Sequence, residues 1–189
     1  MMKETGAAFA NGQKALIAGD YDNAIADYGQ VLRLNPTFVE AYNSRGNAYY
    51  CKRDYDNAIA DYEQAIDINP NYAEAYHNRG DAYYCKGDYD NAIADYERAL
   101  RLNPAYAEAY YTRGNAYRNK GDWDNAIADY ERALRLNPAY VEAYYNRGNA
   151  YYYKKDYARA RADWEKVLQL APNDGNARDN LEALRDMGC

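Results

Sequence analysis

Few side chains in this sequence could carry out chemistry on a substrate. There is one histidine, His77, and the three cysteines are Cys51, Cys85 and Cys189. No nucleophile has a base placed beside it, and no glycine-rich phosphate loop occurs in the sequence. A metal site made from Cys51, His77 and Cys85 is excluded by spacing, because two helical turns, about 12 Å, separate His77 from Cys85. We therefore predict that the protein is not an enzyme and holds no cofactor or metal ion.

The overall charge argues against nucleic acid and membrane partners. The net charge is -6 and the pI is about 4.9, whereas a nucleic-acid partner requires a basic face for its phosphates. The start, MMKETGAAFANGQ, lacks the apolar core of a signal peptide, and no window reaches the length of a membrane span. Cysteines in odd number without a CxxC spacing favour reduced thiols in a cytoplasmic protein. A secreted chain whose leader had been removed would show the same features.

The sequence repeats itself at a fixed step of 34 residues. The segment GDYDNAIADYERALRLNP at 87–104 returns with one change at 121–138, which is 34 residues later. The same step separates all five prolines, five glycines and five alanines: Pro36, Pro70, Pro104, Pro138 and Pro172; Gly12, Gly46, Gly80, Gly114 and Gly148; Ala24, Ala58, Ala92, Ala126 and Ala160. The sequence therefore divides into repeats at 5–38, 39–72, 73–106, 107–140 and 141–174, followed by 175–189.

Each repeat has the pattern of two helices that must position these side chains. In 39–72, Tyr42, Gly46 and Tyr49 recur on one helical face, and a second stripe carries Ala58 and Tyr62. The turn between the stripes contains glycine in three repeats and is followed in every repeat by an aspartate placed to cap the second helix: Asp20, Asp54, Asp88, Asp122 and Asp156. One such pair cannot bury its apolar face alone, which explains the repetition.

These features resemble the tetratricopeptide repeat family over about nine-tenths of the chain. The resemblance rests on the 34-residue step, the small-residue columns at Gly46 and Ala58, the aromatic residues and the closing proline. It implies an all-α fold, a right-handed α-solenoid of five helix-turn-helix repeats in 1–174 with a capping helix in 175–189. The first repeat departs from the pattern, since Ala8 and Ala15 stand where other repeats carry tyrosine.

A second departure is a column of arginines where the family usually has leucine. Its members are Arg45, Arg79, Arg113 and Arg147, and an equally regular aspartate column lies on the second helices: Asp27, Asp61, Asp95, Asp129 and Asp163. A buried arginine needs a partner of opposite charge. We predict Arg–Asp pairs inside or between the repeats.

The resemblance also implies a function, because members of the family hold other proteins and commonly grip an extended peptide along the first helices. Side chains off the packing face of those helices are rich in asparagine, which donates and accepts hydrogen bonds, and in tyrosine, which is enriched at interfaces. The predicted peptide-binding residues are Asn43, Asn47, Tyr50, Glu74, His77, Asn78, Asp81, Tyr84, Glu108, Tyr111, Thr112, Asn115, Arg118, Glu142, Tyr145, Asn146 and Asn149. The glutamates have an alternative explanation, since acidic residues near helix starts are favoured by the helix dipole.

One subclass of the family binds peptide carboxylates through two lysines, an arginine and two asparagines. Asn47 and Asn78 match the two asparagines, but the basic positions carry Asn43, Glu108 and Thr112. We therefore predict a protein or peptide partner whose bound segment is neutral or basic.

An alternative function is a structural or self-assembling repeat protein that stacks through its ends. The first repeat presents Phe9, Ala10, Gln13, Leu16 and Ile17 at the predicted groove positions. This apolar surface could receive a hydrophobic anchor, pack on residues 1–4, or form a homo-oligomer.

Overall fold

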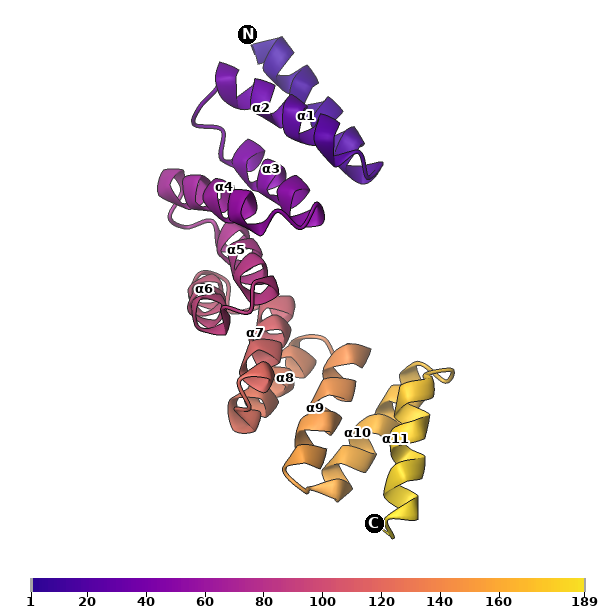
Figure 1. Cartoon of the computed structure of the whole chain (residues 1–189). Helices are drawn as coiled ribbons and strands as arrows, with labels where there is room; N and C mark the ends of the chain where they lie inside the picture. Colours follow the sequence, from indigo (N-terminus) through magenta and orange to yellow (C-terminus); the bar gives the residue numbers. More distant parts are fainter. Residues whose placement is uncertain (1, 189) are drawn as a thin grey trace. The chain divides into compact units, whose positions relative to one another are not determined.

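The structure, a computed structural model, describes residues 2–188 and consists there of helices joined by short turns, without a strand (Figure 1). The helices form two compact units, the first ending at Leu102 and the second beginning at Asn103. The first unit contains α1 Met2–Ile17, α2 Tyr21–Leu34, α3 Val39–Cys51, α4 Tyr55–Ile68, α5 Ala73–Cys85 and α6 Tyr89–Leu102. The second contains α7 Ala107–Asn119, α8 Trp123–Leu136, α9 Val141–Tyr153, α10 Tyr157–Leu170 and α11 Gly175–Asp186. The prediction of an all-α fold is confirmed.

The second helix of each repeat begins directly after the predicted aspartate, which caps it. The side chains of Asp20, Asp54, Asp88, Asp122 and Asp156 each accept a hydrogen bond from the backbone N–H three residues later, at 3.1 to 3.3 Å. These bonds satisfy one of the N–H groups that a helix start leaves without a partner. The first helices α3, α5, α7 and α9 have no side-chain cap and follow an aromatic residue instead.

The two helices of a repeat approach closely because a glycine faces an aromatic ring. A Cβ atom added at Gly46 would lie 2.6 Å from Cε1 of Tyr62, and the same clash recurs in the other repeats. Tyr28, Tyr62, Tyr96 and Tyr130 are at most 1% exposed, so these rings form the centre of the packing. Only a residue without a side chain fits opposite them.

The predicted arginine–aspartate pairs form inside each of the last four repeats. Arg45 donates from Nε and Nη2 to the two carboxylate oxygens of Asp61, at 2.7 and 2.6 Å. The same two-bond geometry joins Arg79 to Asp95, Arg113 to Asp129 and Arg147 to Asp163. Burial raises the pKa of Asp61, and the hydrogen bonds from Arg45 oppose that rise. Because the guanidinium stays charged and both bonds are short, the pair is held ionised.

Removing one partner of such a pair should be costly, and the first repeat offers a matched control. Asp27 occupies the aspartate position there, but Asn11 stands where the arginine would be. We expect Asp61→Ala to lower the free energy of unfolding by about 2–4 kcal/mol, because it leaves Arg45 without its partner in a mostly buried site. Asp27→Ala should cost much less. Urea unfolding followed by circular dichroism measures both, and equal losses would contradict the assignment.

The turn between the two helices requires a left-handed backbone in every repeat. Gly19, Gly87 and Gly121 have φ of 77°, 80° and 79°, while Arg53 and Lys155 occupy the same position with φ of 62°. An L-residue with a side chain is strained in this region, and glycine is not.

We expect Arg53→Gly and Lys155→Gly each to raise the free energy of unfolding by about 0.5–1 kcal/mol, since relief of strain exceeds the added entropy of the unfolded chain. The reverse change, Gly87→Arg, should destabilise by a similar amount. The three variants can be compared by thermal unfolding. A stabilising effect of Gly87→Arg would show that the turn does not carry the strain.

Candidate functional site

In the first unit, amide side chains on the first helices connect one repeat to the next. Nδ2 of Asn78, on α5, donates to Oδ1 of Asn43 at 3.0 Å and to Oδ1 of Asn47 at 3.1 Å, both on α3. Asn43 in turn donates to Glu74 at 3.0 Å and to the hydroxyl of Tyr72 at 3.3 Å. Helices α3 and α5 are therefore joined side by side through polar contacts as well as apolar packing.

The second unit repeats this arrangement and extends it to the last helix. Nδ2 of Asn146 donates to Tyr111 and to Asn115, both at 3.0 Å, and its Oδ1 accepts from Arg118 at 3.1 Å. Asn180, on α11, donates to Asn149 at 3.3 Å. Asn180 is not among the predicted peptide-binding residues, although it lies 34 residues after Asn146 and so continues the same column.

These bonds correct part of the predicted peptide-binding surface. Asn43 and His77 are each 3% exposed and Asn146 is 8% exposed, so they cannot offer a broad contact to a partner. Asn43 and Asn146 are used instead to bridge adjacent first helices. These three side chains therefore offer a peptide little surface.

The other predicted residues keep some contact with solvent. Glu74, Glu108 and Glu142 are exposed. Eleven more are partly exposed: Asn47, Tyr50, Asn78, Asp81, Tyr84, Tyr111, Thr112, Asn115, Arg118, Tyr145 and Asn149. The side-chain oxygens of Asn47, Asn115 and Asn149 accept hydrogen bonds from other residues of the protein. The amide nitrogens of the same side chains can donate hydrogen bonds to a ligand.

The apolar residues of the first repeat are used mainly in packing. Phe9 stacks on Phe38 with ring centroids 5.0 Å apart and contacts Tyr28 at 5.5 Å. Leu16 packs against the cluster that contains Ala24 and Tyr28. The chain itself therefore covers part of the predicted apolar surface, through Phe9 and Leu16. Ala10, Gln13 and Ile17 are exposed, Ile17 at 88%.

Each unit contains a pocket at the same place in the repeat. The pocket of the first unit has a volume of about 300 Å³ and is lined by Asn47, Tyr50, Cys51, Tyr62, Asn78 and Asp81. The pocket of the second unit, of about 310 Å³, is lined by Tyr145, Asn149, Tyr152, Tyr153, Trp164, Asn180 and Ala183. The six residues that line the first pocket correspond, three repeats later along the chain, to six of the residues that line the second. We call these the Asp81 pocket and the Trp164 pocket.

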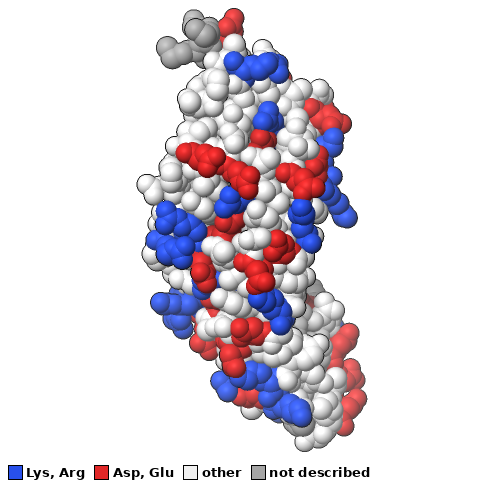
Figure 2. All heavy atoms as spheres, turned by 60° about the vertical axis from the view of Figure 1, so that its left-hand side comes forward, with Lys and Arg blue, Asp and Glu red and all other residues white. Residues whose placement is uncertain are grey.

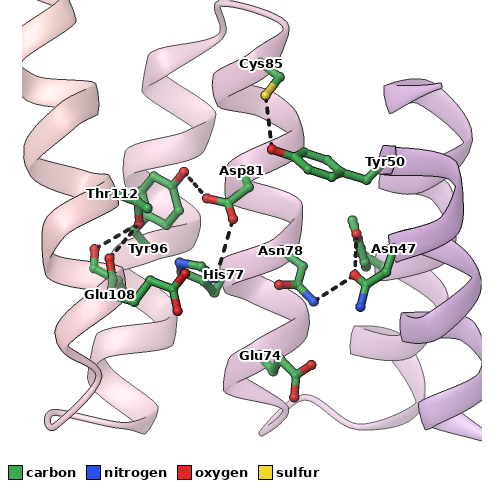
Figure 3. A network of polar contacts seen from close by, with 12 residues as sticks. Asn47, Tyr50, Glu74, His77, Asn78, Asp81, Cys85, Tyr96, Glu108 and Thr112 are labelled. Carbon is green, nitrogen blue, oxygen red and sulfur yellow. Dashed lines mark hydrogen bonds and ion pairs between the residues drawn. The ribbon is translucent and has the colours of Figure 1, made fainter. Parts of the chain in front are cut away.

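The two pockets differ in charge and in aromatic content. Figure 3 shows Asp81 and Asn78 on one helix opposite Asn47 and Tyr50 on the next, with the hydroxyl of Tyr50 lying 3.3 Å from Sγ of Cys85. Burial raises the pKa of Tyr62, and the negative charge of Asp81 raises it further. In the Trp164 pocket, Ala183 replaces the acid, and Tyr152 contacts Tyr153, Tyr157 and Trp164 with centroids 5.5 to 6.1 Å apart.

Acidic groups lie at two places on the first helices of the first unit, Asp81 in its pocket and Glu40 and Glu74 near Tyr72. Burial raises the pKa of Tyr72 to about 12, and the charges of Glu74 and Glu40 add to that rise. Arg45 and Arg79 are occupied by their aspartates on the second helices. The face drawn in Figure 2 shows acidic and basic side chains interspersed.

Residues 2–188 contain neither a membrane-spanning helix nor a metal-binding cluster. None of the helices there is both long and apolar enough to span a bilayer. Within the same residues, no group of three or more histidine, cysteine, aspartate or glutamate side chains is placed to hold a metal ion.

Comparison with known protein families identifies the repeat. A profile described as TPR repeat matches residues 12–52, 80–119 and 114–155. Profiles described as tetratricopeptide repeat match residues 39–72, 61–94 and 141–174. No match is found among curated protein sequences.

Solved structures show the same fold. A crystal structure of MamA protein is 31% identical, with 93% of this chain and 96% of that chain covered and a TM-score of 0.81. MamA 41-end from Desulfovibrio magneticus RS-1 is 22% identical, with coverage of 91% and 97% and a TM-score of 0.83. YrrB, titled a TPR protein with an unusual peptide-binding site, is 23% identical, with coverage of 91% and 89% and a TM-score of 0.76. The last two identities support the fold alone.

The amide contacts between first helices lead to a stability prediction. We expect Asn146→Ala to lower the free energy of unfolding by about 1–3 kcal/mol, because it removes three hydrogen bonds between a buried amide and partly buried partners. Asn71→Ala is the control, since Asn71 is exposed and alanine fills its place at 105 and 139. Chemical unfolding of the two variants measures the difference. Equal stability would show that the amide network contributes nothing.

Proposed function

The chain belongs to the tetratricopeptide repeat family, and from this premise we propose that it binds an extended, neutral or basic peptide segment along its first helices. The observation that carries the proposal is the recurrence of a pocket at equivalent positions in the two units. Both pockets combine tyrosine rings with asparagine amides, and one side chain of a bound peptide fits a space of this size. YrrB, which has the same fold, is described as a TPR protein with an unusual peptide-binding site, and this is consistent with peptide binding.

The asparagine column supports contact with a peptide main chain. Asn47, Asn115 and Asn149 are held in place because their side-chain oxygens accept hydrogen bonds within the protein. Their amide nitrogens can then donate to peptide carbonyl groups without reorganisation, which lowers the entropy cost of binding. Remaining contacts come from the partly exposed tyrosines of the same helices, including Tyr50, Tyr84 and Tyr145.

Charge supports the choice of a neutral or basic segment. Glu40 on α3 and Glu74 and Asp81 on α5 carry negative charge on the first helices of the first unit, while Arg45 and Arg79 are paired with aspartates of the second helices. An acidic segment would meet like charges there, and a basic one would meet complementary charges.

Self-association through the first repeat is the second candidate. It is favoured by one observation, the 88% exposure of Ile17 at the end of α1. The same position carries cysteine, asparagine or tyrosine in the other repeats, so the exposed aliphatic side chain belongs to the first repeat alone.

Selection from a displayed library of random peptides tests the proposal. We expect neutral or basic motifs to be enriched, and Glu74→Lys and Glu108→Lys to weaken binding of basic motifs by about tenfold through loss of complementary charge. Asp67→Lys is the matched control, because it reverses an exposed acid on the second helix α4.

The possible outcomes separate the two candidates. Enrichment of acidic C-terminal peptides would contradict the charge preference. A folded, helical sample that enriches no peptide would contradict peptide binding. Concentration-dependent association in sedimentation experiments that is lost in Ile17→Ser would then support the second candidate.

A further inference from the structure

One acidic side chain in the Asp81 pocket breaks an otherwise uncharged column. The equivalent positions along the chain hold Gln13, Asn47, Asp81, Asn115 and Asn149, so only the third repeat carries a carboxylate there. Its neighbours in the pocket are the ring of Tyr50 and the amides of Asn47 and Asn78. The question is whether packing or ligand binding explains the charge.

The bond from the buried tyrosine does not require a carboxylate at this position. The hydroxyl of Tyr96 donates to Oδ1 of Asp81 at 2.7 Å. In other repeats the equivalent hydroxyl of Tyr62 donates to Asn47 at 2.7 Å, and that of Tyr130 donates to Asn115 at 2.8 Å. An amide oxygen therefore satisfies the buried tyrosine equally well, and the negative charge of Asp81 is additional to this role.

The carboxylate reaches the open space of the pocket. The side chain of Asp81 is 27% exposed, and its Oδ2 lies 3.6 Å from Nδ1 of the buried His77, as Figure 3 shows. The two carboxylate oxygens offer about four acceptor sites, whereas an amide oxygen at the same position offers two. The negative charge also raises the pKa of Tyr50, after burial and the contact with Cys85, which places the charge beside the pocket's aromatic wall.

We propose that the Asp81 pocket binds a basic side chain, with arginine favoured over lysine, of the peptide partner; this inference rests on the proposed function. The carboxylate of Asp81 supplies the opposite charge, and the ring of Tyr50 supplies a face for cation–π contact. A planar guanidinium can stack on the ring while its N–H groups donate to the carboxylate, whereas an ammonium cannot stack in this way. The volume of about 300 Å³ suits one long side chain.

The Trp164 pocket provides an internal comparison. It has the same place in the repeat and nearly the same volume, but Ala183 stands at the position of Asp81. Preference for a basic side chain is thus specific to the Asp81 pocket, and the aromatic Trp164 pocket accepts an uncharged side chain.

The test uses the full chain and an array of nine-residue random peptides made in matched triplets. The members of a triplet differ only at the centre, which is arginine, lysine or citrulline, the uncharged isostere of arginine. We expect the wild type to bind the arginine member about tenfold more tightly than the citrulline member, with a preference that weakens as salt is added.

Two variants and one control locate the preference. Asp81→Asn keeps the acceptor for Tyr96 and should abolish the preference, and Cys51→Lys should do the same by placing a resident ammonium at the pocket wall. Asp67→Asn removes the same charge from the exposed surface of α4 and should leave the preference intact. Circular dichroism melts confirm that each variant is folded.

Each outcome supports or overturns a definite statement. Equal binding of all three triplet members by the wild type would overturn the inference while leaving peptide binding in place. A preference that survives in Asp81→Asn and Cys51→Lys would also overturn it, because the charge would then act from elsewhere. If no triplet binds the folded wild type, both the proposed function and the inference fail.

Discussion

The close approach of a glycine to an aromatic ring is the contact on which the rest of this structure depends. In the second repeat the ring of Tyr62 lies against the backbone at Gly46, which brings α3 and α4 together. The same ring then carries its hydroxyl past the glycine to Asn47, whose oxygen also accepts from Asn78 of the next repeat. The contact that holds a helix pair together therefore also positions the residues that connect neighbouring pairs.

This chain of contacts links packing to the proposed binding surface. The fourth repeat has the same sequence of contacts, from Gly114 through Tyr130 and Asn115 to Asn146. In the fifth repeat Trp164 takes the place of the tyrosine, so no hydroxyl reaches Asn149. The indole nitrogen lies 2.7 Å from the Cβ position at Gly148 and, within residues 2–188, is buried without a hydrogen-bond partner. A change in one core ring thus alters the chemistry of the adjoining pocket.

The arginine–aspartate pairs of the last four repeats do not take part in the glycine–ring contacts. The guanidinium of Arg45 lies 5.7 Å from the ring centroid of Tyr42 and binds Asp61 on the second helix. A family position that is usually leucine is thereby filled by a charged group whose partner is supplied by the same repeat. Because Arg45 and Arg79 bind the aspartates of their own repeats, their charges are already matched there.

The sequence by itself determined the features that depend on local spacing. The two helices of each repeat, the aspartate caps and the glycine columns all involve residues of one repeat, and the 34-residue step exposes them directly. The arginine and aspartate columns are visible in the same way, but the structure decided that they pair inside a repeat. Only the tertiary structure decided which polar columns are covered. Asn43 and Asn78, or Asn146 and Tyr111, lie 35 residues apart, and their contact depends on how one first helix packs on the next. Helical periodicity states which residues share a face, but not which neighbour that face meets. For that reason the sequence placed Asn43 and His77 on an open wall, whereas packing between adjacent repeats buries both.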